Sequence, residues 1–143
     1  LKNIIAIACG ISDGLGFGTN TKAAIVSRGL AEMARLGVSL GAKQATFSGV
    51  SGLGDLVTTC FNSLSRNHYV GEQIGSGKKF KDVISRMKMV AEGVPTARSA
   101  YGLAKKQGVE TPIINEIYNV LFKDKSPLKA VEHLMSRERK AEL

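Results

Sequence analysis

Hydrophobic residues recur at every third or fourth position along most of this chain, which is the spacing of one face of an α-helix. The longest such pattern covers residues 20–40, and Asn20 is expected to cap the first turn of that helix. Residues 1–11 repeat the same spacing, so they predict a helix, although their isoleucines would also suit a strand. The positions of the 20–40 helix expected to face inward are Ala24, Ile25, Leu30, Met33, Ala34 and Leu36.

Three further helices are predicted toward the C-terminus. Thr111–Pro112 and Ser126–Pro127 each pair a capping residue with a proline, which is the arrangement typical of a helix start. A third helical pattern covers residues 95–107, and Gly108 follows it as a helix-ending glycine. Only residues 88–91 alternate as a strand would. The chain therefore predicts a mainly α, multi-helix fold.

Length and composition limit the architecture further. A chain of 143 residues with 43% hydrophobic and 22% charged positions is typical of one globular domain, residues 1–143, with its own core. The longest apolar run, Ile4–Cys9, is far shorter than the roughly 18 residues of a membrane-spanning helix. A first residue of Leu1 in place of methionine indicates a truncated chain. Only two cysteines are present, which favours a reducing, cytoplasmic setting.

The charge balance favours an anionic partner. Lysine and arginine total 20 against 12 acidic residues, a formal net charge of +8. Such an excess attracts nucleic acid, anionic lipid or small phosphorylated molecules. Aromatic residues make up only 6% of the chain and tryptophan is absent, so the stacking side chains that accompany many nucleic-acid sites are scarce. This scarcity weakens the nucleic-acid interpretation without removing it, and charge alone does not choose among the three classes of partner.

One candidate anion site is the run Ser65, Arg66 and Asn67. Ser65 is expected to cap a helix that continues to about Ile74, which leaves free backbone amides beside an outward guanidinium. The alternative is an ordinary helix cap followed by a surface arginine. The residues alone favour this ordinary cap over an anion site.

Asp55 and Lys2 form a second candidate pair. Asp55 lies in an apolar, glycine-rich segment, where a partly buried carboxylate would need a partner. Lys2 lies in an equally apolar stretch and could be that partner, and such surroundings help a lysine to give up a proton. The alternative is that both are solvated surface charges.

Two other kinds of site are not expected. The segment Gly14–Gly18 has neither the GxGxxG spacing nor the preceding strand of a dinucleotide loop, so it predicts a tight turn into the next helix. His68 and His133 have no neighbouring ligands at useful spacing, and the cysteines are far apart in the sequence. No metal site is therefore predicted.

The order of several segments resembles the glycerol-3-phosphate dehydrogenases. The chain contains, in this order and at the family's spacing, LKNIIAIACGISDGLGFGTNTKAAI, GLGDLVTTC, SRN and AEGVPTA. The resemblance covers nearly the whole chain and is strongest over its first seventy residues. It implies the helical C-terminal substrate domain shared by bacterial-type NAD(P)-dependent glycerol-3-phosphate dehydrogenases and, in fold, by 6-phosphogluconate dehydrogenases. The family's N-terminal Rossmann domain, with its GxGxxG loop, would be absent from this chain.

The resemblance also implies roles for individual residues. Lys2 matches the catalytic lysine that protonates the ketone oxygen of dihydroxyacetone phosphate as hydride arrives from NADH or NADPH. The residues implied in substrate binding are Lys2, Asn3, Asp55, Ser65, Arg66 and Asn67. The residues implied in contact with the nicotinamide cofactor are Arg66, Val90 and Glu92.

On this resemblance the chain belongs to an enzyme that interconverts dihydroxyacetone phosphate and sn-glycerol 3-phosphate for glycerophospholipid synthesis. Its expected partners are these substrates, the Rossmann domain and a second copy in a homodimer, and the isolated chain is expected to be inactive. Another lysine-dependent hydroxyacid dehydrogenase is one rival, although it should not repeat SRN after GLGDLVTTC. A basic, non-enzymatic module that binds nucleic acid is the other rival.

Overall fold

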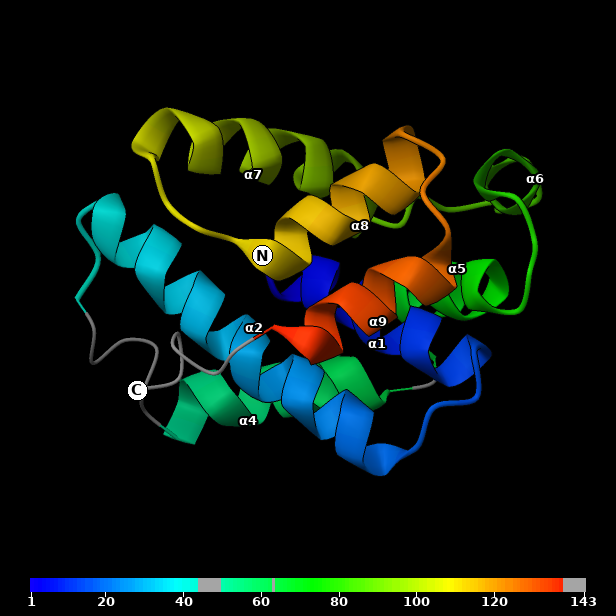
Figure 1. Cartoon of the computed structure of the whole chain (residues 1–143), viewed down its shortest axis with the longest axis horizontal. Helices are drawn as coiled ribbons and strands as arrows, with labels where there is room; N and C mark the ends of the chain where they lie inside the picture. The colour runs from blue at the N-terminus through cyan, green and yellow to red at the C-terminus, as the bar shows by residue number, and fades with distance from the viewer. Residues whose placement is uncertain (44–49, 63, 138–143) are drawn as a thin grey trace.

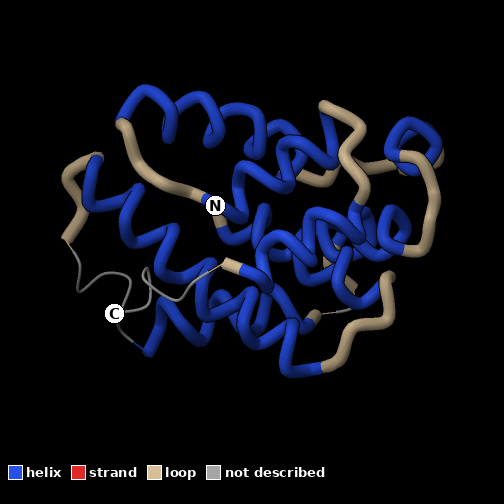
Figure 2. The backbone as a smooth tube through the Cα atoms, viewed as in Figure 1, coloured by secondary structure: helices blue, strands red, loops and turns tan. Residues whose placement is uncertain are grey.

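The computed structural model describes residues 1–43, 50–62 and 64–137, and within them every regular element is an α-helix (Figures 1 and 2). This confirms the mainly α fold. Residues 88–91 form no strand: 88 and 89 lie in a bend, and 90 and 91 have no regular structure. The eight helices of the described residues are α1 (Lys2–Gly14), α2 (Thr19–Ser39), α4 (Val50–Phe61), α5 (Arg66–Gly75), α6 (Phe80–Ser85), α7 (Gly93–Gln107), α8 (Pro112–Phe122) and α9 (Pro127–Ser136).

Helix α1 forms the centre of the domain. It packs against α2, α4, α5, α7 and α8, and Figure 1 shows it running through the middle of the bundle. All its residues from Ile4 to Ser12 are buried, so the helix is enclosed on every side rather than on one face. The helix predicted over residues 1–11 is thus confirmed, and it continues to Gly14 before the predicted turn into α2.

Helices α1 and α5 touch backbone to backbone. Gly10 and Gly14 of α1 face α5, while Gly71 and Gly75 of α5 face α1. A Cβ atom at Gly71 would lie 2.1 Å from the carbonyl oxygen of Ile7, and the other three positions would meet the facing backbone at 2.2 to 2.4 Å. No side chain fits into such distances, so glycine at these positions permits the close approach.

The two helices also run in the same direction. Gly71 faces Ile7, and Gly75 faces Ile11, one turn further along both helices. A parallel arrangement brings the two N-termini to the same end of the contact. The first turn of α1, with Lys2, therefore lies beside the first turn of α5, which begins at Arg66.

A buried carboxylate of α2 caps helix α8. Glu32 is 1% exposed and accepts hydrogen bonds from the backbone N–H groups of Ile113, at 2.6 Å, and Ile114, at 3.2 Å. Thr111 occupies the N-cap position as predicted, but its hydroxyl donates to the Asn115 side chain and does not cap the helix. Burial raises the pKa of Glu32 to about 7, although the two N–H groups favour its charged form.

The remaining helix ends show which local signals are reliable. Ser126 caps α9 through its hydroxyl, and Gly108 ends α7 with a left-handed φ of 66°, both as predicted. The prediction that Asn20 caps α2 is wrong, because the extended backbone of Gly18 already starts the helix and places Asn20 inside its first turn. Of the inward positions predicted for α2, Ile25, Ala34 and Leu36 are buried, and Ala24, Leu30 and Met33 are partly buried.

The close glycine contact predicts a strong asymmetry between two Gly→Ala substitutions. Gly71→Ala should lower the free energy of unfolding by about 3 kcal/mol or more, because the added methyl group forces the two helix backbones apart. Gly102→Ala on α7 is the matched control, since a Cβ there meets nothing within 4 Å. It should raise stability by about 0.5 to 1 kcal/mol through helix propensity. Urea denaturation measures both values, and equal effects would contradict the contact.

The buried carboxyl of Glu32 predicts a pH dependence of stability. Its pKa is about 7 in the folded chain against an ordinary 4.5, so folding takes up a proton between these values. The resulting stabilisation is fully present below pH 4.5 and is lost as the pH rises through 7, on the order of 3 kcal/mol in all. Glu32→Gln, which cannot ionise, should remove this slope. Unfolding free energies of both proteins at pH 4.5, 6 and 8 test the prediction, and parallel pH curves would refute it.

Candidate functional site

Lys2 and Asp55 form an ion pair between the first residue of α1 and the middle of α4. The Lys2 Nζ lies 3.1 Å from Asp55 Oδ1 and 2.9 Å from Oδ2. This confirms the contact expected between the two groups, but the setting is more open than expected. The side chains are 42% and 57% exposed, so the ammonium group is accessible to a ligand.

Arg66 opens helix α5 at the surface. Ser65 is its N-cap, and the Ser65 hydroxyl accepts a hydrogen bond from the His68 N–H at 3.3 Å, as the sequence predicted. The Arg66 Nε donates to the carbonyl oxygen of Val90 at 3.0 Å, and Nη1 lies 3.7 Å from the Met89 sulfur. These bonds hold the guanidinium beside the segment that leads into α7.

Asn67 ties the start of α5 to the start of α7. Its Oδ1 accepts a hydrogen bond from the buried N–H of Gly93 at 2.8 Å. The same glycine lies against α1, because a Cβ there would be 2.8 Å from the carbonyl oxygen of Asn3. Since Asn67 satisfies the first N–H of α7, this helix begins at Gly93 rather than at the predicted Pro95, and Glu92 stands exposed at its N-cap.

Three helix starts therefore meet in one place. We call the residues there the helix-start cluster: Lys2, Asn3, Asp55, Ser65, Arg66, Asn67, Val90 and Glu92. The first backbone N–H groups of a helix have no partners within the helix and give its start a partial positive charge. Together with the Lys2 ammonium and the Arg66 guanidinium, they make this cluster suited to an anion.

A second set of charges lies at the other end of α1 and joins it to two neighbouring helices. Asp13 Oδ2 lies 2.8 Å from the Lys22 Nζ and 2.7 Å from the His68 Nε2, which joins the end of α1 to the starts of α2 and α5. Burial alone would raise the pKa of Asp13, but the hydrogen bonds from Lys22 and His68 hold it below its usual value. The Lys22 ammonium also lies 4.2 Å from the centre of the Phe61 ring of α4.

The two cysteines meet although they are far apart in the sequence. Cys9 of α1 and Cys60 of α4 are both buried and free, and a hydrogen bond with Cys60 together with burial raises the pKa of the Cys9 thiol. Across the described residues, no three His, Cys, Asp or Glu side chains gather as metal ligands. None of the helices described is long and apolar enough to cross a membrane.

The sequence analysis missed several residues that build this site. Gly10, Gly14, Gly71 and Gly75 bring α1 and α5 together, and their spacing of four on each helix is a signal that could have revealed a close helix contact. Asp13 and Lys22 carry no comparable signal. Asp13 pairs with both Lys22 and His68, and His68 lies at a sequence distance from Asp13 that only the folded chain closes.

Sequence comparison identifies relatives of known activity. The family described as "NAD-dependent glycerol-3-phosphate dehydrogenase C-terminus" matches residues 1–132. The glycerol-3-phosphate dehydrogenase [NAD(P)+] of Citrifermentans bemidjiense is 59% identical over 142 residues, which cover 99% of this chain and 42% of that protein. The enzyme of the same name from Geobacter sulfurreducens is 58% identical with the same coverage. This chain thus spans about two fifths of the length of the curated relatives it matches.

Solved structures agree with this comparison. A crystal structure of glycerol-3-phosphate dehydrogenase from Coxiella burnetii superposes with a TM-score of 0.92 at 42% identity, over 96% of this chain and 42% of that one. The glycerol-3-phosphate dehydrogenase of Saccharomyces cerevisiae gives a TM-score of 0.82 at 26% identity, over 95% of this chain and 40% of that one.

Proposed function

The chain belongs to the NAD-dependent glycerol-3-phosphate dehydrogenase C-terminal family, and we propose that its helix-start cluster binds dihydroxyacetone phosphate and sn-glycerol 3-phosphate during their NAD(P)-dependent interconversion. The observation that supports this most is the meeting of two cationic side chains, Lys2 and Arg66, with the positive ends of three helices. A small phosphate ester with a reducible carbonyl group needs these two features together.

Arg66 is the residue that we assign to the substrate phosphate. Its Nε is bound to the Val90 carbonyl, which fixes the plane of the guanidinium, and one N–H of Nη1 faces the Met89 sulfur. The remaining N–H groups are available to a ligand. Ser65 and Asn67 fix the position of this turn through their own hydrogen bonds. A phosphate beside Arg66 would also face the first backbone amides of α5.

Lys2 is the residue that we assign to proton transfer. When bound, the reduced nicotinamide supplies hydride to the carbonyl carbon of the substrate. The ammonium group of Lys2 then gives its proton to the carbonyl oxygen, and in the reverse direction the amine takes the proton back. An ammonium has three N–H bonds, of which Asp55 engages two at most, so one remains for the substrate oxygen. Asp55 orients the group, and Asn3 lies in the next position of the same turn.

The edge of the cluster fits a nucleotide. Val90 is 69% exposed and Met89 is 62% exposed, so the segment presents apolar surface next to the Arg66 guanidinium, and the Glu92 carboxylate follows it. NADH and NADPH contain rings, phosphates and ribose hydroxyl groups. The apolar side chains could contact a ring, Arg66 could bind a phosphate, and the Glu92 carboxylate could accept hydrogen bonds from hydroxyl groups. On this proposal, Arg66 contacts both the substrate and the cofactor.

The chain spans about two fifths of the length of its relatives, so we expect the complete reaction to need residues from the remaining part of such a polypeptide as well. We assign the binding of the rest of the dinucleotide to a Rossmann domain outside this chain, and expect the 143-residue chain alone to show no turnover. A homodimer is a further expectation from the family resemblance. The activity tests below therefore use the polypeptide that contains both domains.

Lys2→Met should separate catalysis from binding. If Lys2 gives its proton in the transition state, the substitution should lower kcat about 10²- to 10⁴-fold and change KM much less. Lys106→Met, at an exposed position of α7, is the matched control and should leave both constants unchanged. Steady-state kinetics with dihydroxyacetone phosphate measure the effect. An unaltered kcat would remove Lys2 from its assigned role.

Arg66→Ala should weaken the phosphate contact. Loss of a charge-assisted bond should cost about 1.5 to 3 kcal/mol, or roughly one to two orders of magnitude in affinity for dihydroxyacetone phosphate. Binding of unphosphorylated dihydroxyacetone should not change, and thermal unfolding of the variant shows whether the fold is intact. If instead substrate affinity is unaffected and the wild type binds nucleic acid at moderate salt, the site belongs to a basic binding module.

A further inference from the structure

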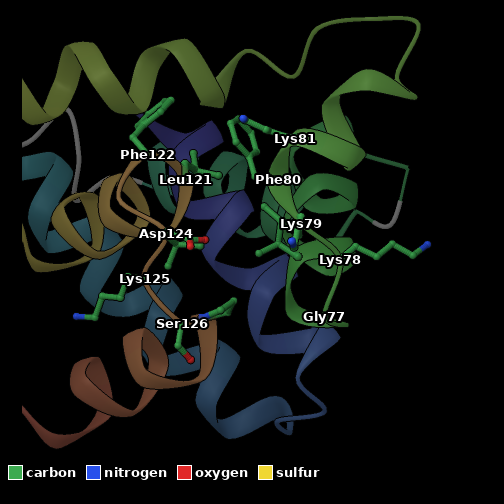
Figure 3. A pocket seen from close by; sticks show the side chains of 13 residues that line it. Gly77, Lys78, Lys79, Phe80, Lys81, Leu121, Phe122, Asp124, Lys125 and Ser126 are labelled. Carbon is green, nitrogen blue, oxygen red and sulfur yellow. The ribbon is translucent and has the colours of Figure 1, made fainter.

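A cavity lies away from the helix-start cluster. Its volume is about 660 Å³, within the range of roughly 300 to 1,000 Å³ typical of small-molecule sites. It opens between the loop before α6 and the loop that joins α8 to α9 (Figure 3). Helix α5 separates the two places, because Arg66 begins this helix and the cavity starts near its end at Ile74. Ten residues of helix correspond to about 15 Å.

The floor of this cavity is apolar. Ile74, Val120 and Leu121 are buried core residues that line it. Phe80 and Phe122 stand above them, with ring centres 6.0 Å apart in an edge-to-face arrangement. These side chains come from the end of α5, the start of α6 and the end of α8, so the floor is built on three packed helices rather than on one loop.

The rim of the cavity is cationic. Four lysines and a single acidic residue, Asp124, belong to its lining, and the lysines are Lys78, Lys79, Lys81 and Lys125. Figure 3 shows them distributed around the opening, with Lys78 and Lys125 pointing to opposite sides and Asp124 between them.

Two of these four lysines have neither an ion pair nor a hydrogen-bond partner within the described residues. Lys125 forms an ion pair with Glu116, and Lys78 donates to the Gln73 side chain. Within the described residues, Lys79 and Lys81 take part in no ion pair. Both side chains are exposed, so their flexible stems can move toward a ligand.

We propose that this cavity binds an anionic amphiphile, namely a phosphate monoester head group that carries a single apolar chain. The lysines attract the head group at the rim, and the floor takes the chain out of water. The positive charge of the rim and the apolar floor both point to this class. An inorganic anion would use only the rim, and an apolar ligand would leave the charges of Lys79 and Lys81 uncompensated. This site does not depend on the function proposed for the helix-start cluster.

The ligand series that tests the proposal is inorganic phosphate, butyl phosphate and octyl phosphate, titrated calorimetrically into the complete protein as monomeric solutes. Affinity should rise about three- to fourfold for each added methylene group, which is roughly 100-fold from butyl to octyl phosphate. Arg66→Ala should leave the affinity for octyl phosphate unchanged, because the two sites are separate. An affinity independent of chain length, or one lost with Arg66→Ala, would overturn the proposal.

Charge variants supply the second arm of the test. The double variant Lys79→Gln/Lys81→Gln should weaken octyl phosphate binding at least tenfold. The control Lys43→Gln/Lys106→Gln removes the same charge at two exposed positions outside the cavity. It should change the affinity for octyl phosphate less than twofold. Equal effects of the two double variants would refute a specific site.

Asp124→Asn should tighten binding severalfold, because it removes the one carboxylate of the lining. Asparagine tolerates the left-handed φ of 56° at this position, so the loop is retained. Weaker or unchanged binding would contradict a site for a phosphate head group. Binding to anionic phospholipid vesicles without binding to octyl phosphate would assign the lysines to a membrane surface and overturn the proposal.

Discussion

The contact between the backbones of α1 and α5 fixes the position of nearly everything else in this domain. Four glycines allow the two helices to lie closer than any side chain would permit, and the parallel direction of the helices places their first turns side by side. The ammonium group of Lys2 and the guanidinium of Arg66 project from these two turns. The absence of side chains at these glycines thus sets the distance between the two helices. It sets the geometry of two charged groups that lie 64 positions apart in the sequence.

Carboxylates hold cationic side chains in place at both ends of helix α1. Asp55 faces Lys2 at the open end of α1, and Asp13 binds Lys22 and His68 at its other end. The first pair is exposed and available to a ligand, whereas the second is largely enclosed and joins helices. The same type of interaction therefore serves binding at one end of the central helix and packing at the other. Burial decides between the two uses, because it excludes competing ligands and water.

The sequence predicted the helix caps that neighbouring residues form, and it missed the contacts between residues that are far apart in the chain. Ser65 and Ser126 cap their helices as expected, because the hydroxyl and the amide that it binds are three residues apart. The cap of α8 comes instead from Glu32, whose partner Ile113 is 81 residues away. The sequence indicated only that Lys2 and Asp55, each in an apolar segment, would need partners of opposite charge. It did not show that the two side chains meet. The roles of the site residues came from a family resemblance, which carries information that spacing and composition do not contain.

The burial of α1 on all sides has a consequence for how the chain folds. This helix is synthesised before the rest of the domain, yet its covering comes from elements as distant as α5, α7 and α8. Until those segments have been made, a nascent chain exposes the apolar side chains of this helix. Exposed apolar surface of this kind promotes aggregation and is bound by chaperones. Contacts over such sequence distances form slowly, because the intervening loop must first close. The helix that organises the finished domain is therefore its most vulnerable part during synthesis.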